Sequence, residues 1–325
     1  GLRYAVLDGH GLLHGRPRPR YGVYAPICSR NGVAVFGRDS EATLPVWSAK
    51  AGYTGDPDYR EFHRDLGWDL PLEQLAPLGL SEPRPLGLKL HRVTDHSAPL
   101  DQKQPYHPSI AAERIRHHAS HYLKGRRRQL DQLSNGMTIS PLLVAPFDAE
   151  LFGHWWFEGP SFLAELFRQG PSNGVVFTRL RDVLNGSQQL QLCDPCPSSW
   201  GQGGYHNYWL NDSNAWVVPE WARAGEAMVQ RCSRGVAREA DLQLLSQAAR
   251  ELLLAQSSDW SFILRAGTTT GLARERIERH LKRFWMLMAA IDGSGDLPEG
   301  WLEEVQADDR LFPSIQPLDW AKVGS

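Results

Sequence analysis

The first half of the chain alternates between short apolar stretches and longer amphipathic ones. The apolar stretches predict strands over residues 4–7, 33–37, 87–93, 141–145 and 174–178. Apolar residues at helical spacing predict a long helix over residues 108–133 and a shorter one over residues 158–168. This alternation is typical of a parallel α/β sheet or barrel, in which the carboxyl ends of the strands share the face that carries an active site.

The pattern changes after about Val217. Three long amphipathic stretches follow, with no strand candidate between them: residues 220–234, 239–256 and 272–291. We therefore predict an α/β domain over residues 1–215 and an all-helical domain over residues 216–325.

The composition excludes several classes of protein. The chain has 325 residues, is 42% hydrophobic and carries a formal net charge of −2, so neither disorder nor a general positive field for nucleic acid or anionic membranes is expected. No apolar run approaches the roughly 20 residues that span a bilayer. We therefore expect neither a nucleic-acid partner nor a membrane. Tryptophan occurs 12 times, more often than tyrosine, phenylalanine or methionine.

The cysteines give little sign of a metal site. Cys193 and Cys196 form a CxxC motif, but no second CxxC or histidine pair follows at zinc spacing. Pro195 and Pro197 favour a loop there, which argues against a redox motif at the start of a helix. We predict unpaired thiols in a cytoplasmic protein, with a metal or redox site as the alternative.

Histidines gather on the predicted long helix. His117 and His121 share a face of that helix, which allows a metal-binding interpretation. No carboxylate completes an HExxH pattern, so a solvated helix surface is favoured. We expect no metal and no organic cofactor.

The chain begins inside a predicted strand. Residues 3–7 read as a buried strand, and such a strand needs neighbours on both sides for its backbone groups. The first residues lack the charged and apolar regions of a signal peptide. We expect Gly1 to be an internal position of a longer protein; a trimmed or mature terminus is the alternative.

The segment over residues 144–158 carries the strongest candidate chemistry. Asp148 follows an apolar strand, and neighbouring aromatic side chains that exclude water would raise its pKa, so that it could protonate a leaving oxygen. His154, Trp155 and Trp156 would form a flat wall that suits a sugar ring. The alternative is a tryptophan-rich core with a capping aspartate.

Two other segments are aromatic and polar at once. Residues 198–211 present Trp200, Tyr205, His206 and Trp209 on a glycine-rich stretch that lacks the residues of a phosphate loop. This stretch predicts a binding surface or a contact between domains, and the two interpretations are compatible. His10 follows the first strand and is either a site residue or structural.

Several of these stretches together resemble the α-1,4-glucan branching enzymes of glycoside hydrolase family 57. Residues 148–158 (DAELFGHWWFE) resemble the fourth motif of that family, and further similar stretches follow the family order along nearly the whole chain: residues 18–24 (RPRYGVY), 46–53 (VWSAKAGY), 59–62 (YREF), 198–201 (SSWG) and 248–260 (AARELLLAQSSDW). The resemblance implies an incomplete (β/α)7 barrel, present here in part, followed by a helical C-terminal domain.

The resemblance also implies roles for individual residues. Family members retain the anomeric configuration through a covalent glycosyl-enzyme, with a glutamate nucleophile and Asp148 as the general acid/base. Trp200 and Trp209 match positions along the acceptor path, and Trp68 is a further candidate. His10, His154 and Trp155 are expected to bind substrate. The loop over residues 25–31 resembles a mobile loop that favours transfer over hydrolysis.

One part of the family pattern is absent from this sequence. The strand with the glutamate nucleophile precedes the segment at which this chain begins, and Glu41, Glu61 and Glu158 stand in other contexts. We therefore expect the chain alone to be inactive and, within a full-length protein, to form α-1,6 branches in glycogen- or starch-type α-1,4-glucan. The alternatives are an α-amylase-like hydrolase of the same family and a non-catalytic α-glucan-binding protein.

Overall fold

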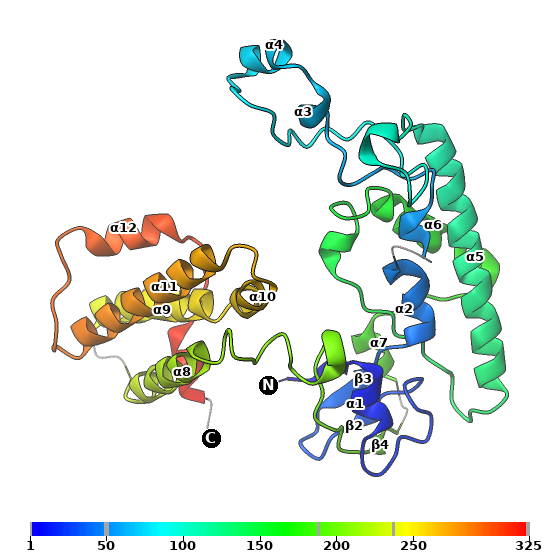
Figure 1. Cartoon of the computed structure of the whole chain (residues 1–325). Helices are drawn as coiled ribbons and strands as arrows, with labels where there is room; N and C mark the ends of the chain where they lie inside the picture. The colour runs from blue at the N-terminus through cyan, green and yellow to red at the C-terminus, as the bar shows by residue number, and fades with distance from the viewer. Residues whose placement is uncertain (1, 49–51, 187–188, 236–237, 323–325) are drawn as a thin grey trace. The chain divides into compact units, whose positions relative to one another are not determined.

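The computed structural model describes residues 2–48, 52–186, 189–235 and 238–322. Gly1 and three residues of the motif over residues 46–53 (Ala49, Lys50 and Ala51) lie outside this range. The chain forms two compact units, Gly1–Ser199 and Trp200–Ser325, which we describe separately (Figure 1).

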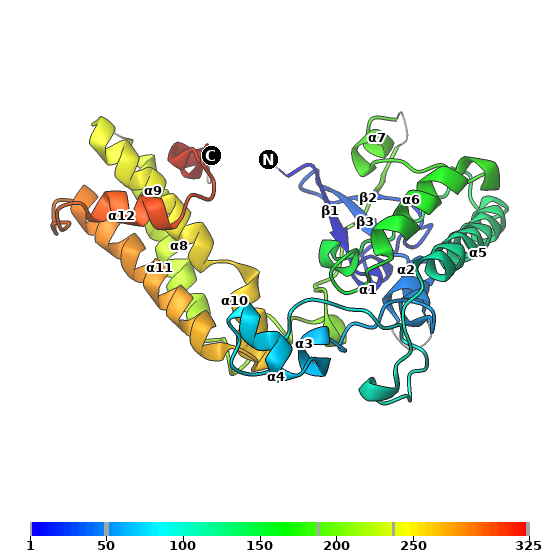
Figure 2. The same ribbon diagram turned by 90° about the horizontal axis from the view of Figure 1, so that it is seen from above.

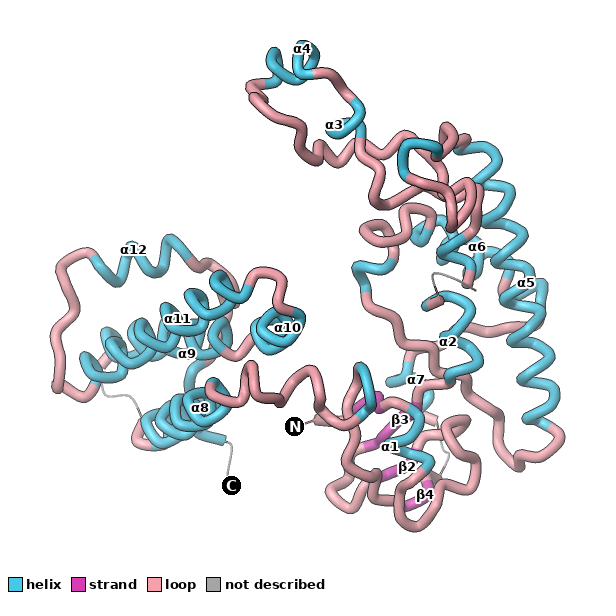
Figure 3. Tube along the Cα trace, viewed as in Figure 1, coloured by secondary structure: helices cyan, strands magenta, loops and turns pink. Residues whose placement is uncertain are grey.

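The first unit contains a small mixed sheet (Figure 3). Its strand order is β1-β3-β2-β4, and the bounds are β1 (Tyr4–Leu7), β2 (Ile27–Cys28), β3 (Ala34–Gly37) and β4 (Gln191–Leu192). Strands β1 and β3 are parallel, with register from Tyr4 opposite Ala34 to Leu7 opposite Gly37, while β2 is antiparallel to β3. The predicted α/β class is confirmed. Because β2 lies within residues 25–31, the segment that resembles a mobile loop forms one arm of a hairpin.

An aspartate follows each of the two parallel strands within two residues and caps the helix that comes next. Asp8 caps α1 (Gly9–Leu13) and Asp39 caps α2 (Ser40–Trp47); their carboxylates accept hydrogen bonds from the backbone N–H groups of Gly9 (2.7 Å) and Glu41 (3.1 Å). Such caps satisfy N–H groups that a helix leaves unpaired. The strand order therefore brings these polar residues to one edge of the sheet.

Two helices build the larger core of this unit. Helix α5 (Pro108–Ser134) and helix α6 (Gly159–Gln169) pack against each other (Figures 1 and 2). The sequence predicted both helices to within one residue at each end. Between them lies a buried cluster that includes Tyr59, Ile115, Leu123, Trp156 and Phe162. The short helix α7 (Leu180–Leu184) follows later in the unit.

Three of the five predicted strands are wrong. Residues 141–145 are extended but bond to two separate partners, because Leu142 N–H donates to the Tyr24 carbonyl and Val144 O accepts from Asp39 N–H. Residues 87–93 make only isolated bridges, and residues 174–178 form no ladder, with Val176 86% exposed. An apolar run forms a strand only where a neighbouring segment supplies a continuous row of backbone partners.

A long excursion of this unit is closed by one carboxylate. Asp65 is buried and accepts hydrogen bonds from the backbone N–H groups of Gly67, Leu86 and Gly87, each at 2.9 Å. Lys89 Nζ lies 3.1 Å from the same carboxylate. In the loop that Asp65 closes, α3 (Leu66–Asp69) directly follows Asp65 at the base, and α4 (Leu72–Leu75) lies at the outer end (Figures 1 and 2).

The second unit is helical in the part that the structure describes. Helices α9 (Glu239–Ala255) and α11 (Thr270–Ile291) pack along each other, and α8 (Val217–Ser233), α10 (Ser258–Ala266) and α12 (Trp301–Asp308) complete the unit. The predictions for α8, α9 and α11 are confirmed, whereas α10 and α12 were not predicted. Residues 200–216 belong to this unit, so the division falls before the predicted boundary at residue 215.

Among the described residues, no helix combines the length and the apolar character needed to cross a membrane.

Candidate active site

The first unit contains a cavity of about 550 Å³ that includes Asp148. Its lining combines aromatic rings with charged groups of both signs. The charged and aromatic members are Trp47, Arg60, Glu61, Phe62, His63, His96, Lys103, Asp148, Glu150, Trp155 and Trp156. A cavity of this size accommodates a small organic ligand or a short segment of a polymer.

Asp148 reaches this cavity from an extended segment next to the sheet. Val144 O accepts a hydrogen bond of 2.8 Å from Asp39 N–H, which fixes the segment beside the end of β3. A short 3-10 helix over Ala149–Leu151 follows, and Asp148 directly precedes it. Asp148 is exposed, so the expectation that neighbouring aromatic side chains exclude water from it is wrong, and its carboxyl group is accessible to a ligand and to water.

An aromatic stack forms one wall of the cavity. The rings of Phe62 and Trp155 are nearly parallel, with centroids 4.6 Å apart and an interplanar angle of 28°. His154 stands edge-on against both rings, at 5.8 Å from Phe62 and 5.1 Å from Trp155. Trp155 is 54% exposed. A large exposed ring held in place by a second ring offers a flat apolar surface to a ligand.

The second carboxylate of the same wall is already occupied. Glu61 is buried, accepts a 2.7 Å hydrogen bond from His63 N–H, and lies 3.6 Å from Lys103 Nζ. Lys103 also donates to the carbonyls of Val93 (2.8 Å) and Asp95 (2.6 Å). Because both members of this pair are held by further bonds, the Glu61 side chain is fixed in the wall.

Glu158 lies behind the wall and holds it in place. One of its carboxylate oxygens accepts a 3.0 Å hydrogen bond from Arg60 N–H, and burial raises the pKa of this carboxyl group. The Arg60 guanidinium stacks on the ring of Phe157, 3.5 Å from its centroid. Burial also raises the pKa of the neighbouring Tyr106. Arg60 thus enters the cavity from a fixed backbone position.

A buried tyrosine and histidine link helix α5 to the same region. The Tyr59 hydroxyl and His118 Nδ1 share a hydrogen bond of 2.8 Å, and His118 Nε2 lies 3.5 Å from Asp56. Burial lowers the pKa of His118 to about 4, so it is neutral at pH 7. Tyr53 bonds to His121 in the same way, at 2.7 Å. His117 and His121, the two histidines of the predicted solvated surface, are both exposed, and His121 also bonds to Tyr53; the neighbouring His118 is half-buried.

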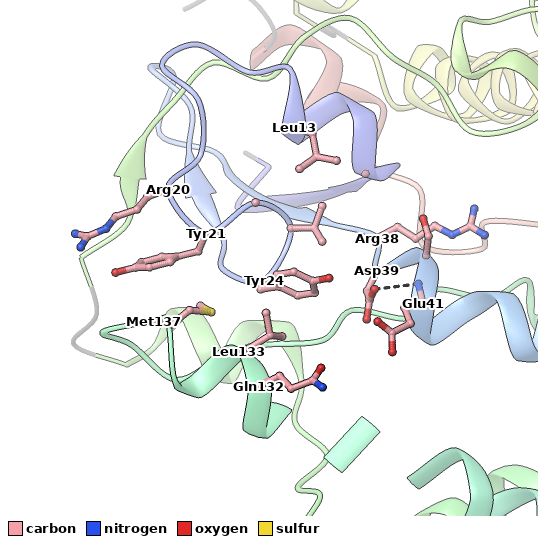
Figure 4. A pocket seen from close by; sticks show the side chains of 15 residues that line it. Leu13, Arg20, Tyr21, Tyr24, Arg38, Asp39, Glu41, Gln132, Leu133 and Met137 are labelled. Atoms are coloured by element: carbon pink, nitrogen blue, oxygen red, sulfur yellow. Dashed lines mark hydrogen bonds between the residues drawn. The ribbon is translucent and has the colours of Figure 1, made fainter. Parts of the chain in front are cut away.

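A second cavity, of about 520 Å³, lies between residues 20–24 and the end of α5 (Figure 4). Tyr24 faces Leu133 at its apolar end, while Asp39 and Glu41 lie at its polar end (Figure 4). These two carboxylates are engaged, because Gln129 donates to Asp39 (2.9 Å) and Arg126 donates to Glu41 (2.9 Å). None of the predicted site residues lines it, so the cavity with Asp148 is the stronger candidate.

Comparison with known proteins identifies the chain. Residues 220–320 match the family model described as "1,4-alpha-glucan branching enzyme, C-terminal". A 1,4-alpha-glucan branching enzyme of Thermococcus kodakarensis is 32% identical over 97% of this chain and 46% of its own length. A GH57-type branching enzyme of Pyrococcus horikoshii superimposes with a TM-score of 0.83 at 30% identity, over 98% of this chain and 57% of its own. The chain is a homologue of the family 57 glucan branching enzymes.

A further solved structure, described as the α-amylase AmyC of Thermotoga maritima, has a TM-score of 0.83 at 35% identity, over 98% of this chain and 60% of its own. The chain spans about half the length of the curated branching enzymes that it matches. The family 57 resemblance that the sequence motifs indicate is confirmed.

The predicted site residues of this branching-enzyme homologue fall into separate groups. Asp148 and Trp155 line one cavity, and His154 packs against Trp155. His10 lies in α1, where its carbonyl accepts from Cys196 Sγ at 3.4 Å, and Trp68 lies in α3, 56% exposed; neither lines the Asp148 cavity. Trp200 and Trp209 belong to the second unit, where the Trp209 indole N–H donates to the Trp200 carbonyl at 3.3 Å.

The sequence did not single out Phe62, Arg60 and Lys103 as individual site residues. A signal existed for the first two, because they belong to the YREF stretch that resembles the branching enzymes. Lys103 carried no such signal, since it reaches the cavity from a segment without a motif. All four cysteines are free thiols in the structure.

Proposed function

We propose that this chain is the portion of a glucan branching enzyme that supplies the general acid/base, Asp148, and a surface for the α-1,4-glucan. The observation that carries the proposal is the opening of Asp148 into the same cavity as the stacked pair of Phe62 and Trp155. A proton donor beside an aromatic platform suits cleavage of a bond between two sugar rings. The homology to branching enzymes favours this function over a non-catalytic glucan-binding role.

Asp148 would act twice in a retaining transfer. In the first step its proton passes to the glycosidic oxygen as the α-1,4 bond breaks and the donor glucan is bonded to the nucleophile. In the second step the Asp148 carboxylate takes the proton of a glucan 6-hydroxyl, whose oxygen displaces the nucleophile and forms the α-1,6 bond. The exposed position of Asp148 supports both proton transfers.

The nucleophile in this proposal is a glutamate outside the present sequence. Retention by this route needs two carboxyl groups about 5–5.5 Å apart. Glu61 does not suit this role, because Lys103 and the backbone of His63 occupy its two oxygens. We assign the first unit, together with the following residues up to 215, to the C-terminal part of a (β/α)7 barrel and residues 216–325 to the helical domain of a cytoplasmic enzyme.

Substrate contacts in this proposal come from several parts of the chain. Trp155 and His154 would bind glucan beside Asp148, and His10 would contribute from the end of β1. Trp68, Trp200 and Trp209 would bind more distant sugar units. Their ring faces match the apolar faces of glucose, and the neutral glucan needs no charged partner.

The test uses the full-length protein that contains this chain. The variant Asp148→Asn should lose at least about a thousandfold in branching rate, since an amide cannot supply the proton, with an unchanged circular dichroism spectrum. The assay counts α-1,6 linkages formed in amylose. The 325-residue chain alone should form none. Retained branching in the variant would remove Asp148 from its role, and new reducing ends without branches would indicate a hydrolase.

A further inference from the structure

We propose that Phe262, on helix α10, is a glucan-binding residue that forms an aromatic platform with Tyr208 and Trp209 on the second unit. This inference rests on the proposed function, because it requires an α-glucan ligand, and it adds residues to which the sequence motifs assign no role. Tyr208 and Trp209 come from the loop before α8, whereas Phe262 comes from a separate helix.

The three rings lie against one another. The rings of Phe262 and Tyr208 are nearly parallel, with centroids 4.8 Å apart and an angle of 23°. Phe262 and Trp209 are 5.9 Å apart at 43°. Phe262 remains 46% exposed, and the other two rings are half-buried. The part of the Phe262 ring that its neighbours leave uncovered is accessible to a ligand.

The platform is held by a buried amide. Asn214 is fully buried, and its Nδ2 donates to the carbonyls of Tyr208 (2.9 Å) and Ser261 (3.2 Å). Ser261 directly precedes Phe262, so this one side chain ties the loop to α10 at the rings. The indole N–H of Trp209 is fixed as well, by its bond to the Trp200 carbonyl. Rings already held in place lose little freedom when a ligand binds.

The chemistry of the surface fits a neutral polysaccharide. The exposed side of Phe262, backed by Tyr208 and Trp209, offers an apolar surface to the C–H face of a glucose unit. Arg265, whose guanidinium carbon lies 5.9 Å from the Tyr208 centroid, offers N–H donors to hydroxyl groups at the rim. The competing explanation is that Phe262 only fastens the loop to α10. In that case any apolar side chain of similar size would serve equally well.

The experiment compares Phe262→Ala, Phe262→Leu and Phe262→Trp in the full chain, with Leu272→Ala as the control, because Leu272 is 45% exposed on the neighbouring helix α11. Calorimetry with maltoheptaose measures the dissociation constant. We expect about tenfold weaker binding for the alanine and leucine variants, and binding within about twofold of wild type for the tryptophan variant and the control. Thermal melting checks that each variant is folded.

The outcomes separate this inference from the proposed function. Wild-type affinity in Phe262→Leu would show a purely structural contact and overturn the platform. The variant Trp155→Ala, in the other unit, tests the Asp148 cavity in the same assay. If only that variant loses affinity, the platform fails and the proposed function stands. If the wild-type chain binds no maltoheptaose, both are contradicted.

Discussion

Phe62 and Trp155 stack on each other at a centroid distance of 4.6 Å, in the wall of the cavity that contains Asp148. The two residues lie far apart in the sequence, yet each belongs to a stretch that resembles the family 57 branching enzymes. The contact therefore joins two sequence motifs into one surface beside the proposed acid/base.

This stack leads to the first prediction. Phe62→Leu and Trp155→Ala should each weaken the binding of maltoheptaose about tenfold, because each removes one of the two stacked rings in the cavity wall. Phe167→Ala is the matched control, since Phe167 is an exposed ring on α6 outside the cavity. Calorimetry on the 325-residue chain provides the measurement. Equal affinity of Phe62→Leu and wild type would exclude a role for the stack in binding.

The second prediction separates two contributions of Glu158 to the stability of the fold, its hydrogen bond to Arg60 and its charge. Glu158→Ala should lower the free energy of unfolding by about 1–3 kcal/mol, because the N–H of Arg60 loses its acceptor. Glu158→Gln keeps a carbonyl acceptor and should cost much less. Burial raises the pKa of Glu158, so its ionised form disfavours the folded state and wild-type stability falls as the pH rises from about 4.3 through the raised pKa.

Urea unfolding at pH 4 and pH 7 tests both statements. The free energy of unfolding of Glu158→Gln minus that of wild type should be larger at pH 7 than at pH 4. Glu113→Gln, at an exposed position of α5, serves as the control. An alanine variant as stable as the glutamine variant would show that the bond to Arg60 contributes nothing.

His118 makes the stability of the first unit depend on pH in the opposite direction. Its pKa is about 4 in the folded state because of burial and about 6.5 in an unfolded chain. Between these values the unfolded state binds one proton more, so stability is lost as the pH falls, by roughly 3 kcal/mol in total. His118→Asn should remove this dependence, whereas His117→Asn should keep it. Urea unfolding from pH 4 to pH 7 gives the slopes, and equal slopes in both variants would contradict the assignment.

Two glycines should respond to alanine in opposite ways. Gly125 lies inside α5, where an added Cβ would meet nothing within 4 Å, so Gly125→Ala should stabilise the chain by about 0.5–1 kcal/mol. At Gly67 an added Cβ would lie 1.9 Å from the Arg84 carbonyl oxygen, so Gly67→Ala should destabilise it. Thermal melting of the two variants provides the comparison. A lower melting temperature for Gly125→Ala would disprove the first statement.

The second unit contains a buried hydrogen bond between a histidine and a carboxyl group, and its loss should be costly. His280 Nδ1 lies 2.6 Å from Glu251 Oε2, and both side chains are almost fully buried. His280→Ala leaves a buried carboxylate without this partner, which typically costs about 3–5 kcal/mol. Asp309 lies close enough for the three to hold a metal ion. Since Arg283 already pairs with Asp309 at 3.0 Å, EDTA should leave the melting temperature unchanged, and a fall would reveal a metal.

The sequence predicted the parts of the fold that are governed by local pattern. Helices α5, α6, α8, α9 and α11 follow from their apolar periodicity, and the strands β1 and β3 from short apolar runs. The runs over residues 87–93, 141–145 and 174–178 looked similar but form no strands, because strand pairing depends on partners that a local pattern does not contain. Helix α10 was missed because its nine residues follow α9 after a short turn.

The candidate site was predictable only where a motif carried it. Asp148, His154 and Trp155 follow from one contiguous stretch; in the structure Asp148 and Trp155 line one cavity, and His154 packs against Trp155. The ion pair of Lys103 with Glu61 and the bond from Arg60 to Glu158 join residues that are distant in the sequence. Such contacts arise from tertiary packing and leave no periodic trace in a single sequence.

The carboxylate of Asp65 has a consequence for the evolution of the cavity. It accepts hydrogen bonds from both ends of the loop over residues 66–87. The two ends of this loop therefore meet at Asp65, where the loop joins the rest of the unit. Insertions or deletions between α3 and Leu86 would change how far α4 extends, while Arg60, Glu61 and Phe62 would keep their places in the cavity wall. The excursion can therefore diverge in length and sequence independently of the cavity wall from which it emerges.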